Sequence, residues 1–332
     1  MYSESNKCFL KLIEEPPISS SIMETNIYKN DKNIDYICYV EGPTDTTFYG
    51  NLKNCPLSNK KIEFISMPTS QEGAFSDEIG KEGVISRYFS IYRFPNYKKL
   101  LSKSIFIIDH DFEGLTSEKY DPGELDETVF TITKPYAFEN YFLTKSNLQK
   151  IFSYFNLSSN SYYKFEEYLN KLVYETSTYT RLKSSVTIAC KKGKYKTYLP
   201  SSKCIIPSGN FAGRVMEPKN IFHFDFLGKY QYFYNRKFLN IQNEKMKNSI
   251  KNDKKILDYY NNISIKFKNK IEYTRGHDIF NMLETYLMQI HNINISQSKF
   301  AKNSRYKEIV RILDVDIDFV NGHGERILWI KL

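Results

Sequence analysis

The chain has few of the features that mark secreted, membrane-spanning or zinc-binding proteins. Its five cysteines are scattered without a CxxC pair, at Cys8, Cys38, Cys55, Cys190 and Cys204. This spacing predicts reduced thiols rather than a disulfide framework or a zinc site. No run approaches the roughly 18 uninterrupted apolar residues of a membrane span, and the first residues lack the basic-then-apolar order of a signal peptide. We therefore expect a soluble, cytoplasmic protein with no membrane partner.

Two common enzyme motifs are missing as well. No GxxxxGK[ST] loop is present, which argues against ATP hydrolysis by a Walker mechanism. No recognisable motif places a serine or cysteine nucleophile beside a base. Any catalytic activity would therefore depend on residues other than a Walker loop or a serine or cysteine nucleophile.

The composition is that of a folded, basic protein. The chain has 332 residues, of which 41% are hydrophobic and 16% aromatic, enough for one large domain or two ordinary ones with a real core. Its formal net charge of +9 favours a polyanionic partner such as nucleic acid. Richness in Lys, Asn, Ile and Tyr is also typical of an AT-rich coding sequence. The net charge alone therefore does not establish that the partner is a polyanion.

Four apolar runs of strand length alternate with helical patterns in the first half of the chain. They are 34–40, 61–67, 104–109 and 128–133. Helical segments are expected from Pro43, from about Asp77 and over 137–143. This order predicts an α/β fold with a mostly parallel sheet and helices on both faces. We expect an N-terminal arm over 1–33, an α/β domain over 34–144, and a mainly helical domain over 145–332 with a basic insert near 181–203.

Acidic residues follow three of the four predicted strands. Glu41 follows the first, Asp109 and Asp111 end the third in "SIFIIDHDFEG", and Glu139 follows the fourth. Carboxyl ends of parallel strands share one edge of the sheet, so these side chains should converge there. Alternation along a strand turns Asp109 and Asp111 to the same side, where two carboxylates repel unless a cation or proton lies between them. Such oxygen pairs suit Mg²⁺.

Each of these acids also has a simpler interpretation. An isolated DxD pair is equally consistent with solvated aspartates at a polar strand end. In "EGPTD", Gly42 permits a tight turn and Pro43 begins a helix, so Asp45 could be a ligand or a helix N-terminal cap.

The order of these motifs resembles a known family. "YVEGPTDTTFY", then "FIIDHDFEG", then "KPYAFENYFL" is similar to the Toprim signature, and in particular to the Toprim-like family of unknown function that includes the nuclease subunit of PARIS-type anti-phage systems (AriB). The similarity to OLD-family nucleases is more distant. The resemblance covers roughly 35–145 well and the helical remainder only loosely. It implies a Rossmann-like Toprim core with a phosphodiesterase site that depends on Mg²⁺ or Mn²⁺.

The resemblance also implies roles for single residues. Glu41, Asp109 and Asp111 would hold the metal, with Asp45 as partner of Glu41 and Glu139 as an additional acid. Topoisomerase-type Toprim domains often carry a third Asp where this chain has Glu113. OLD-like enzymes place a lysine near the site; Lys134 is positioned for that role, and a solvated loop lysine is the competing interpretation.

Other segments carry weaker signals. Basic residues with interleaved tyrosines are typical of a groove for single-stranded or looped nucleic acid, or of a solvated surface; here they are Arg181, Lys183, Lys191, Lys192, Lys194 and Lys196. Gly276 and His277 in "RGHD" could aim an imidazole into a cleft or simply form a turn. The acidic "DVDID" stretch at 314–318 is expected to be solvated.

The leading hypothesis is therefore a metal-dependent nuclease that cleaves RNA, such as tRNA, or DNA. The resemblance implies a toxic effector in anti-phage defence, controlled by a partner ATPase, with a homodimer as a candidate activated state. Two alternatives stay open: a catalytically silent Toprim scaffold acting as a sensor or partner, and a DxD-type phosphatase or transferase. Glu113 stands where the haloacid-dehalogenase pattern wants Thr or Val, which counts against the phosphatase.

Overall fold

The computed structural model describes the chain in two compact units. The described residues are 34–67, 80–92, 97–110, 128–135, 137–170, 173–174, 222–224, 230–232, 276–295 and 304–327, with single helical positions at 244, 248, 254, 258 and 261. One unit comprises the described residues up to Asp109, those of Pro122–Lys134 and those from Asp314 onward. The second unit comprises the described residues of His110–Asp121 and Pro135–Leu313.

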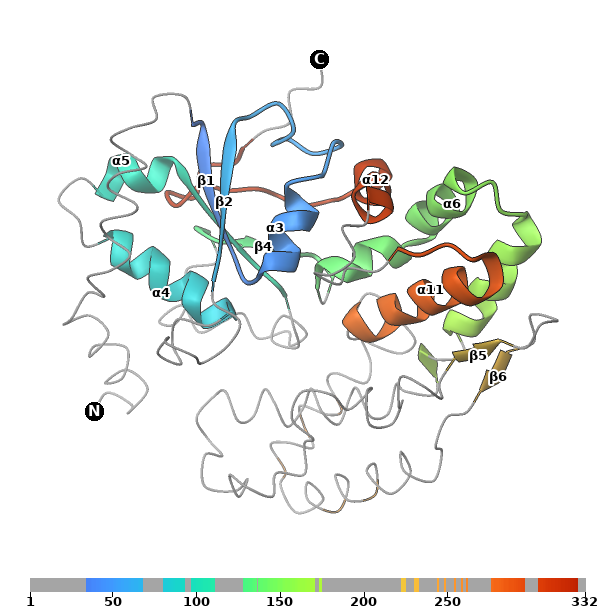
Figure 1. Cartoon of the computed structure of the whole chain (residues 1–332). Helices are drawn as coiled ribbons and strands as arrows, with labels where there is room; N and C mark the ends of the chain where they lie inside the picture. Colours follow the sequence, from blue (N-terminus) through green and yellow to red (C-terminus); the bar gives the residue numbers. More distant parts are fainter. Residues whose placement is uncertain are drawn as a thin grey trace. The chain divides into compact units, whose positions relative to one another are not determined.

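The first unit contains a four-stranded parallel sheet (Figure 1). Its strands are β1 (Tyr36–Val40), β2 (Ile62–Ser66), β3 (Ser104–Ile108) and β4 (Thr131–Ile132), in the order β2-β1-β3-β4. Every neighbouring pair is parallel. The predicted α/β class with a parallel sheet is confirmed. The fourth strand is shorter than predicted, because only Thr131 and Ile132 pair with β3 while residues 128–130 form a turn.

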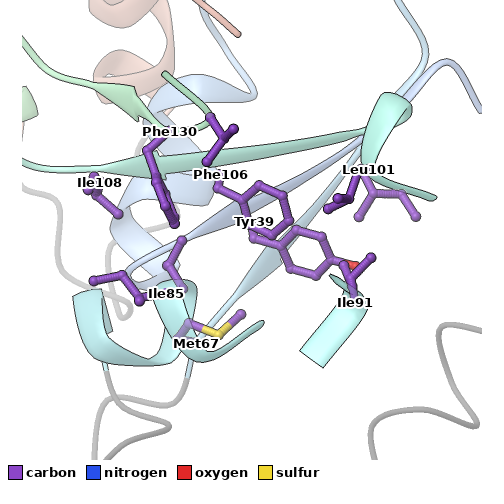
Figure 2. Close-up of a cluster of buried hydrophobic side chains, with 11 residues drawn as sticks. Tyr39, Met67, Ile85, Ile91, Leu101, Phe106, Ile108 and Phe130 are labelled. Atoms are coloured by element: carbon purple, nitrogen blue, oxygen red, sulfur yellow. The ribbon is translucent and has the colours of Figure 1, made fainter. Parts of the chain in front are cut away.

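Both faces of the sheet are covered, as alternation along β1 shows. Ile37 and Tyr39 join the cluster of Figure 2, which also contains Val84 and Ile85 of helix α4 (Gly80–Tyr92). Cys38, one residue out of phase, is fully buried, and the pKa of its thiol is raised well above its usual range by burial and by the nearby Cys55. Parallel sheets are stable when both faces are shielded in this way, which explains why the strand sequences are almost continuously apolar.

Among the described residues, three helices connect the strands. Helix α3 (Pro43–Tyr49) begins at Pro43 as predicted and lies on one side of β1 and β2. Helix α4 and helix α5 (Tyr97–Ser102) lie on the other side (Figure 1). The helix predicted to begin at about Asp77 is α4, which begins at Gly80. Gly80 has a φ of +55°, a backbone conformation that favours glycine.

The C-terminal segment returns to this sheet. Its apolar residues Val315, Ile317 and Phe319 are buried, while Asp314, Asp316 and Asp318 are exposed as expected for the acidic stretch. The backbone N–H of Val320 donates to the Thr131 hydroxyl at 3.0 Å, and that of Gly322 donates to the carbonyl of Ser104 at 2.8 Å. The structure thus groups residues from Asp314 with the α/β unit, whereas the predicted division at 144/145 assigned them to the helical domain. Contacts between segments this distant in sequence leave no local pattern.

The second unit is mainly helical, with an aromatic core. Its elements are the 3₁₀ helix η3 (Phe138–Leu143), α6 (Lys145–Tyr154), a helix over 159–170, α11 (Gly276–His291), α12 (Ser304–Ile312) and an antiparallel pair, β5 (Phe222–Phe224) and β6 (Tyr230–Tyr232). Phe142 of η3 packs edge-to-face on Phe280 of α11, with ring centroids 4.7 Å apart. Among the described helices, none is long and apolar enough to cross a membrane.

Candidate active site

Two predicted acids meet at the carboxyl edge of the sheet. Glu41 directly follows β1 and Asp109 directly follows β3, and β1 and β3 are neighbours in parallel. The Glu41 carboxylate accepts a hydrogen bond from the backbone N–H of Asp109 at 2.8 Å. The structure therefore brings together the "EG" and "DHD" motifs, which lie 68 positions apart in the sequence.

These two acids lie at the topological switch point of the sheet. The chain leaves β1 through α3 to reach β2 on one side, and leaves β2 through α4 and α5 to reach β3 on the other. Ligands of open α/β sheets bind outside the carboxyl ends of strands at such a point. The location of Glu41 and Asp109 is thus the position in this sheet where a bound substrate is most expected.

Two residues that the sequence interpretation missed hold Asp109 in place. Lys81, on the first turn of α4, is 9% exposed, and its ammonium donates to the backbone carbonyl of Asp109 at 2.7 Å. The buried Thr133, just after β4, places its hydroxyl 3.5 Å from the Asp109 carboxylate. A helix that follows a strand in a parallel sheet begins near the carboxyl edge of the sheet. A lysine in the first turn of such a helix is therefore a candidate site residue. In a chain with 47 Lys and Arg residues, one such lysine does not stand out.

Asp45 is buried at the start of α3, four residues after Glu41 in the chain. It is 7% exposed, and burial raises the pKa of its carboxyl to about 7. Hydrogen bonds from the backbone N–H groups of Gly42 and Asp45 and from the Thr44 side chain oppose this rise. An acid at this helical position that reaches back to the N-cap N–H satisfies a donor which the helix itself cannot. The N-cap of α3 is Gly42, so Asp45 acts from within the first turn of the helix and is not the cap residue itself; its catalytic role stays a prediction.

Lys134 lies on the surface of the α/β unit. Its ammonium is 2.5 Å from the Asp316 carboxylate, and the two side chains are 50% and 80% exposed. Pairs this exposed contribute little stability. The placement favours a solvated lysine, and the buried lysine beside Asp109 is Lys81 instead.

Glu139 belongs to the second unit, where it is almost fully buried on η3. It is 8% exposed, and its neighbour Asn140 accepts a hydrogen bond from the backbone N–H of Ala137. Gly276, at the start of α11, packs directly on this pair: a Cβ there would lie 3.1 Å from the Glu139 Cβ and 3.2 Å from the Asn140 backbone nitrogen. The glycine of "RGHD" therefore has a packing role. Convergence of Glu139 with the sheet-edge acids remains a prediction.

Replacing Gly276 by Ala is expected to destabilise the protein by about 1–3 kcal/mol, because the new methyl group would collide with the side-chain oxygen of Asn140. Helix propensity alone predicts the opposite sign, a gain of up to about 1 kcal/mol. Urea denaturation measures the difference. Met288→Ala, at a 48% exposed position of the same helix, is the control and should change the unfolding free energy little. A Gly276→Ala protein at least as stable as wild type would contradict this packing role.

Several predicted site residues lie outside the described residues. These are Asp111, Glu113, Arg181, Lys183, Lys191, Lys192, Lys194 and Lys196. For His277 the structure describes the backbone, within α11, but not the side chain. Their predicted roles in metal and nucleic-acid binding stay predictions.

The described donor set fits part of a magnesium site. Mg²⁺ takes one or two carboxylates with water and phosphate oxygens, and Glu41 and Asp109 are two carboxylates at adjacent strand ends. In the part of the chain that the structure describes, no three His, Cys, Asp or Glu side chains gather as a metal site. Asp111, the predicted third ligand, is not among these residues.

Comparison with known proteins adds no family assignment. No family model matches this chain, and no curated protein is similar enough to count as a relative.

Proposed function

We propose that this protein is a Mg²⁺- or Mn²⁺-dependent nuclease built on a Toprim-like core. The observation that carries the proposal is the hydrogen bond between the Glu41 carboxylate and the Asp109 backbone at the switch point of the sheet. It joins the two motifs on which the Toprim resemblance rests, at the edge where such sheets bind their ligands.

In this proposal Glu41 and Asp109, together with Asp111, hold the metal ion. When bound, the ion supplies charge neutralisation at the phosphate and activation of the attacking water. Glu41 fixes the backbone of Asp109, and Thr133 limits the orientation of its carboxylate. The Asp45 carboxyl accepts hydrogen bonds from backbone N–H groups in the turn that follows Glu41.

The substrate and biological setting follow from the resemblance and from charge. We propose a nucleic-acid substrate, RNA such as tRNA or else DNA, held partly by the basic 181–203 segment. The net charge of +9 supports a polyanionic substrate. A role as a toxic effector in anti-phage defence, controlled by a partner ATPase in the cytoplasm, extends the resemblance to PARIS-type systems.

The proposal is tested by incubating the full chain, with its partner, with RNA and DNA pools in the presence of Mg²⁺, Mn²⁺ or EDTA. We expect cleavage with either metal, a loss of at least about a hundredfold in EDTA, and recovery when Mg²⁺ is added back. Cleavage that persists undiminished in EDTA would contradict a metal mechanism. No cleavage of any nucleic acid by the partnered protein would favour the silent-sensor alternative.

A further inference from the structure

Lys81 is a buried cation beside the two candidate metal ligands. Its ammonium and the Glu41 carboxylate bind the carbonyl and the N–H of the same residue, Asp109, at 2.7 and 2.8 Å. Backbone geometry therefore keeps the two charged groups within roughly 9 Å of each other. Lys81 is 9% exposed, and a buried ammonium needs nearby negative charge to offset the cost of leaving water. Glu41 and Asp109 are the described carboxylates at this edge of the sheet.

The position of Asp109 does not depend on Lys81 alone. Residues Ile107 and Ile108 pair with β4, and the backbone N–H of Thr133 donates to the Ile108 carbonyl at 3.1 Å. Glu41 holds the Asp109 N–H independently. Several anchors thus fix the geometry of Asp109, whereas Lys81 places a positive charge there.

We propose that Lys81 is an internal counterion of this site: it balances the sheet-edge carboxylates in the metal-free protein and weakens their binding of a divalent cation. This inference rests on the proposed function, because it assumes that Glu41 and Asp109 are metal ligands. It makes Lys81 a charge-balancing residue of the site. The consequence is a site that binds metal weakly by itself and more strongly when a substrate phosphate adds negative charge.

The proposal predicts that removing the Lys81 charge strengthens metal binding. If Lys81 only stabilised the fold, its removal would not strengthen metal binding. Replacing Lys81 by Met removes the charge but keeps the length of the side chain, so Mn²⁺ affinity of the substrate-free protein should rise by about tenfold. Lys81→Arg keeps the charge and should stay within about twofold of wild type. Lys134→Met removes an equal charge from an exposed position and is the matched control, also expected within about twofold.

Mn²⁺ binding to the full chain is measured by electron paramagnetic resonance or calorimetry, with a thermal melt to check folding. Unchanged or weaker Mn²⁺ binding by Lys81→Met would overturn the counterion role. Loss of folding in both Lys81→Met and Lys81→Gln would also overturn it, because Lys81 would then be a structural cation. If wild type binds Mn²⁺ and Glu41→Gln does not, the metal site stands whatever Lys81 does. No Mn²⁺ binding by wild type and Lys81→Met alike would instead reject the proposed metal site.

Discussion

Replacing Glu41 by Gln is expected to lower metal-dependent cleavage by about a thousandfold, without unfolding the α/β unit. Gln keeps a side-chain oxygen that can accept the hydrogen bond from the Asp109 backbone, so the link between β1 and β3 should survive. It removes one negative charge and one hard oxygen ligand from the proposed metal site. A thousandfold loss corresponds to about 4 kcal/mol of transition-state stabilisation.

The matched control is Glu63→Gln. Glu63 lies within β2, the strand on the other side of β1, and pairs with Ile37 rather than lying at the carboxyl edge. Its replacement removes the same charge from the same sheet and should change the cleavage rate less than about twofold. Single-turnover cleavage with saturating Mg²⁺ separates the chemical step from product release. A Glu41→Gln protein that cleaves at the wild-type rate would remove Glu41 from the site.

Replacing Asp45 by Asn is expected to stabilise the protein above pH 7 by a few kcal/mol. Burial raises the pKa of the Asp45 carboxyl from 3.8 to about 7, so the folded protein binds a proton there that the unfolded chain releases. Between about pH 4 and pH 7 the unfolding free energy contributed by Asp45 therefore falls as the pH rises, and above pH 7 the full penalty is present. A pKa shift of this size lowers the free energy of unfolding by a few kcal/mol, on the order of magnitude expected from linkage. Asn removes the charge and keeps an acceptor for the start of α3.

Urea denaturation in EDTA at several pH values between 4.5 and 8 measures this effect. The difference in unfolding free energy between variant and wild type should be smallest at the acidic end and grow until about pH 7. Asp318→Asn is the control, because Asp318 is exposed in the same unit, and its difference should stay small at every pH. A difference between Asp45→Asn and wild type that does not vary with pH would show that the Asp45 carboxylate is ionised in the folded protein at low cost.

The parallel sheet could be predicted because its signals are local. An apolar run such as 104–108 is buried on both faces of a parallel sheet, and it shows this in its own composition. Pro43 marks the beginning of α3 for a similarly local reason, since its fixed φ suits the first helical turn. The return of Val315, Ile317 and Phe319 to the sheet could not be predicted in this way. Their alternation predicts a half-buried extended segment but does not identify the sheet on which it packs.

The residues of the candidate site also fall into those that local sequence predicts and those that depend on long-range contacts. Glu41 and Asp109 were identified from the sequence because each directly follows a strand, and strand ends of a parallel sheet share an edge. Lys81 was missed because its importance comes from one long-range hydrogen bond, which no spacing rule describes. Lys134 was the lysine indicated by the resemblance to OLD-like enzymes, with a solvated loop lysine as the competing interpretation, and the structure places it in an exposed ion pair.

The sequence by itself determined the α/β class, the start of the first helix and the acids that follow β1 and β3, because each depends on residues that are adjacent in the chain. Only the tertiary structure decided that the Glu41 carboxylate binds the Asp109 backbone, that the Asp45 carboxyl is buried deeply enough to raise its pKa, and that the buried Lys81 binds the backbone carbonyl of Asp109. Burial and charge contacts depend on which distant segments pack together. That information arises from the fold as a whole.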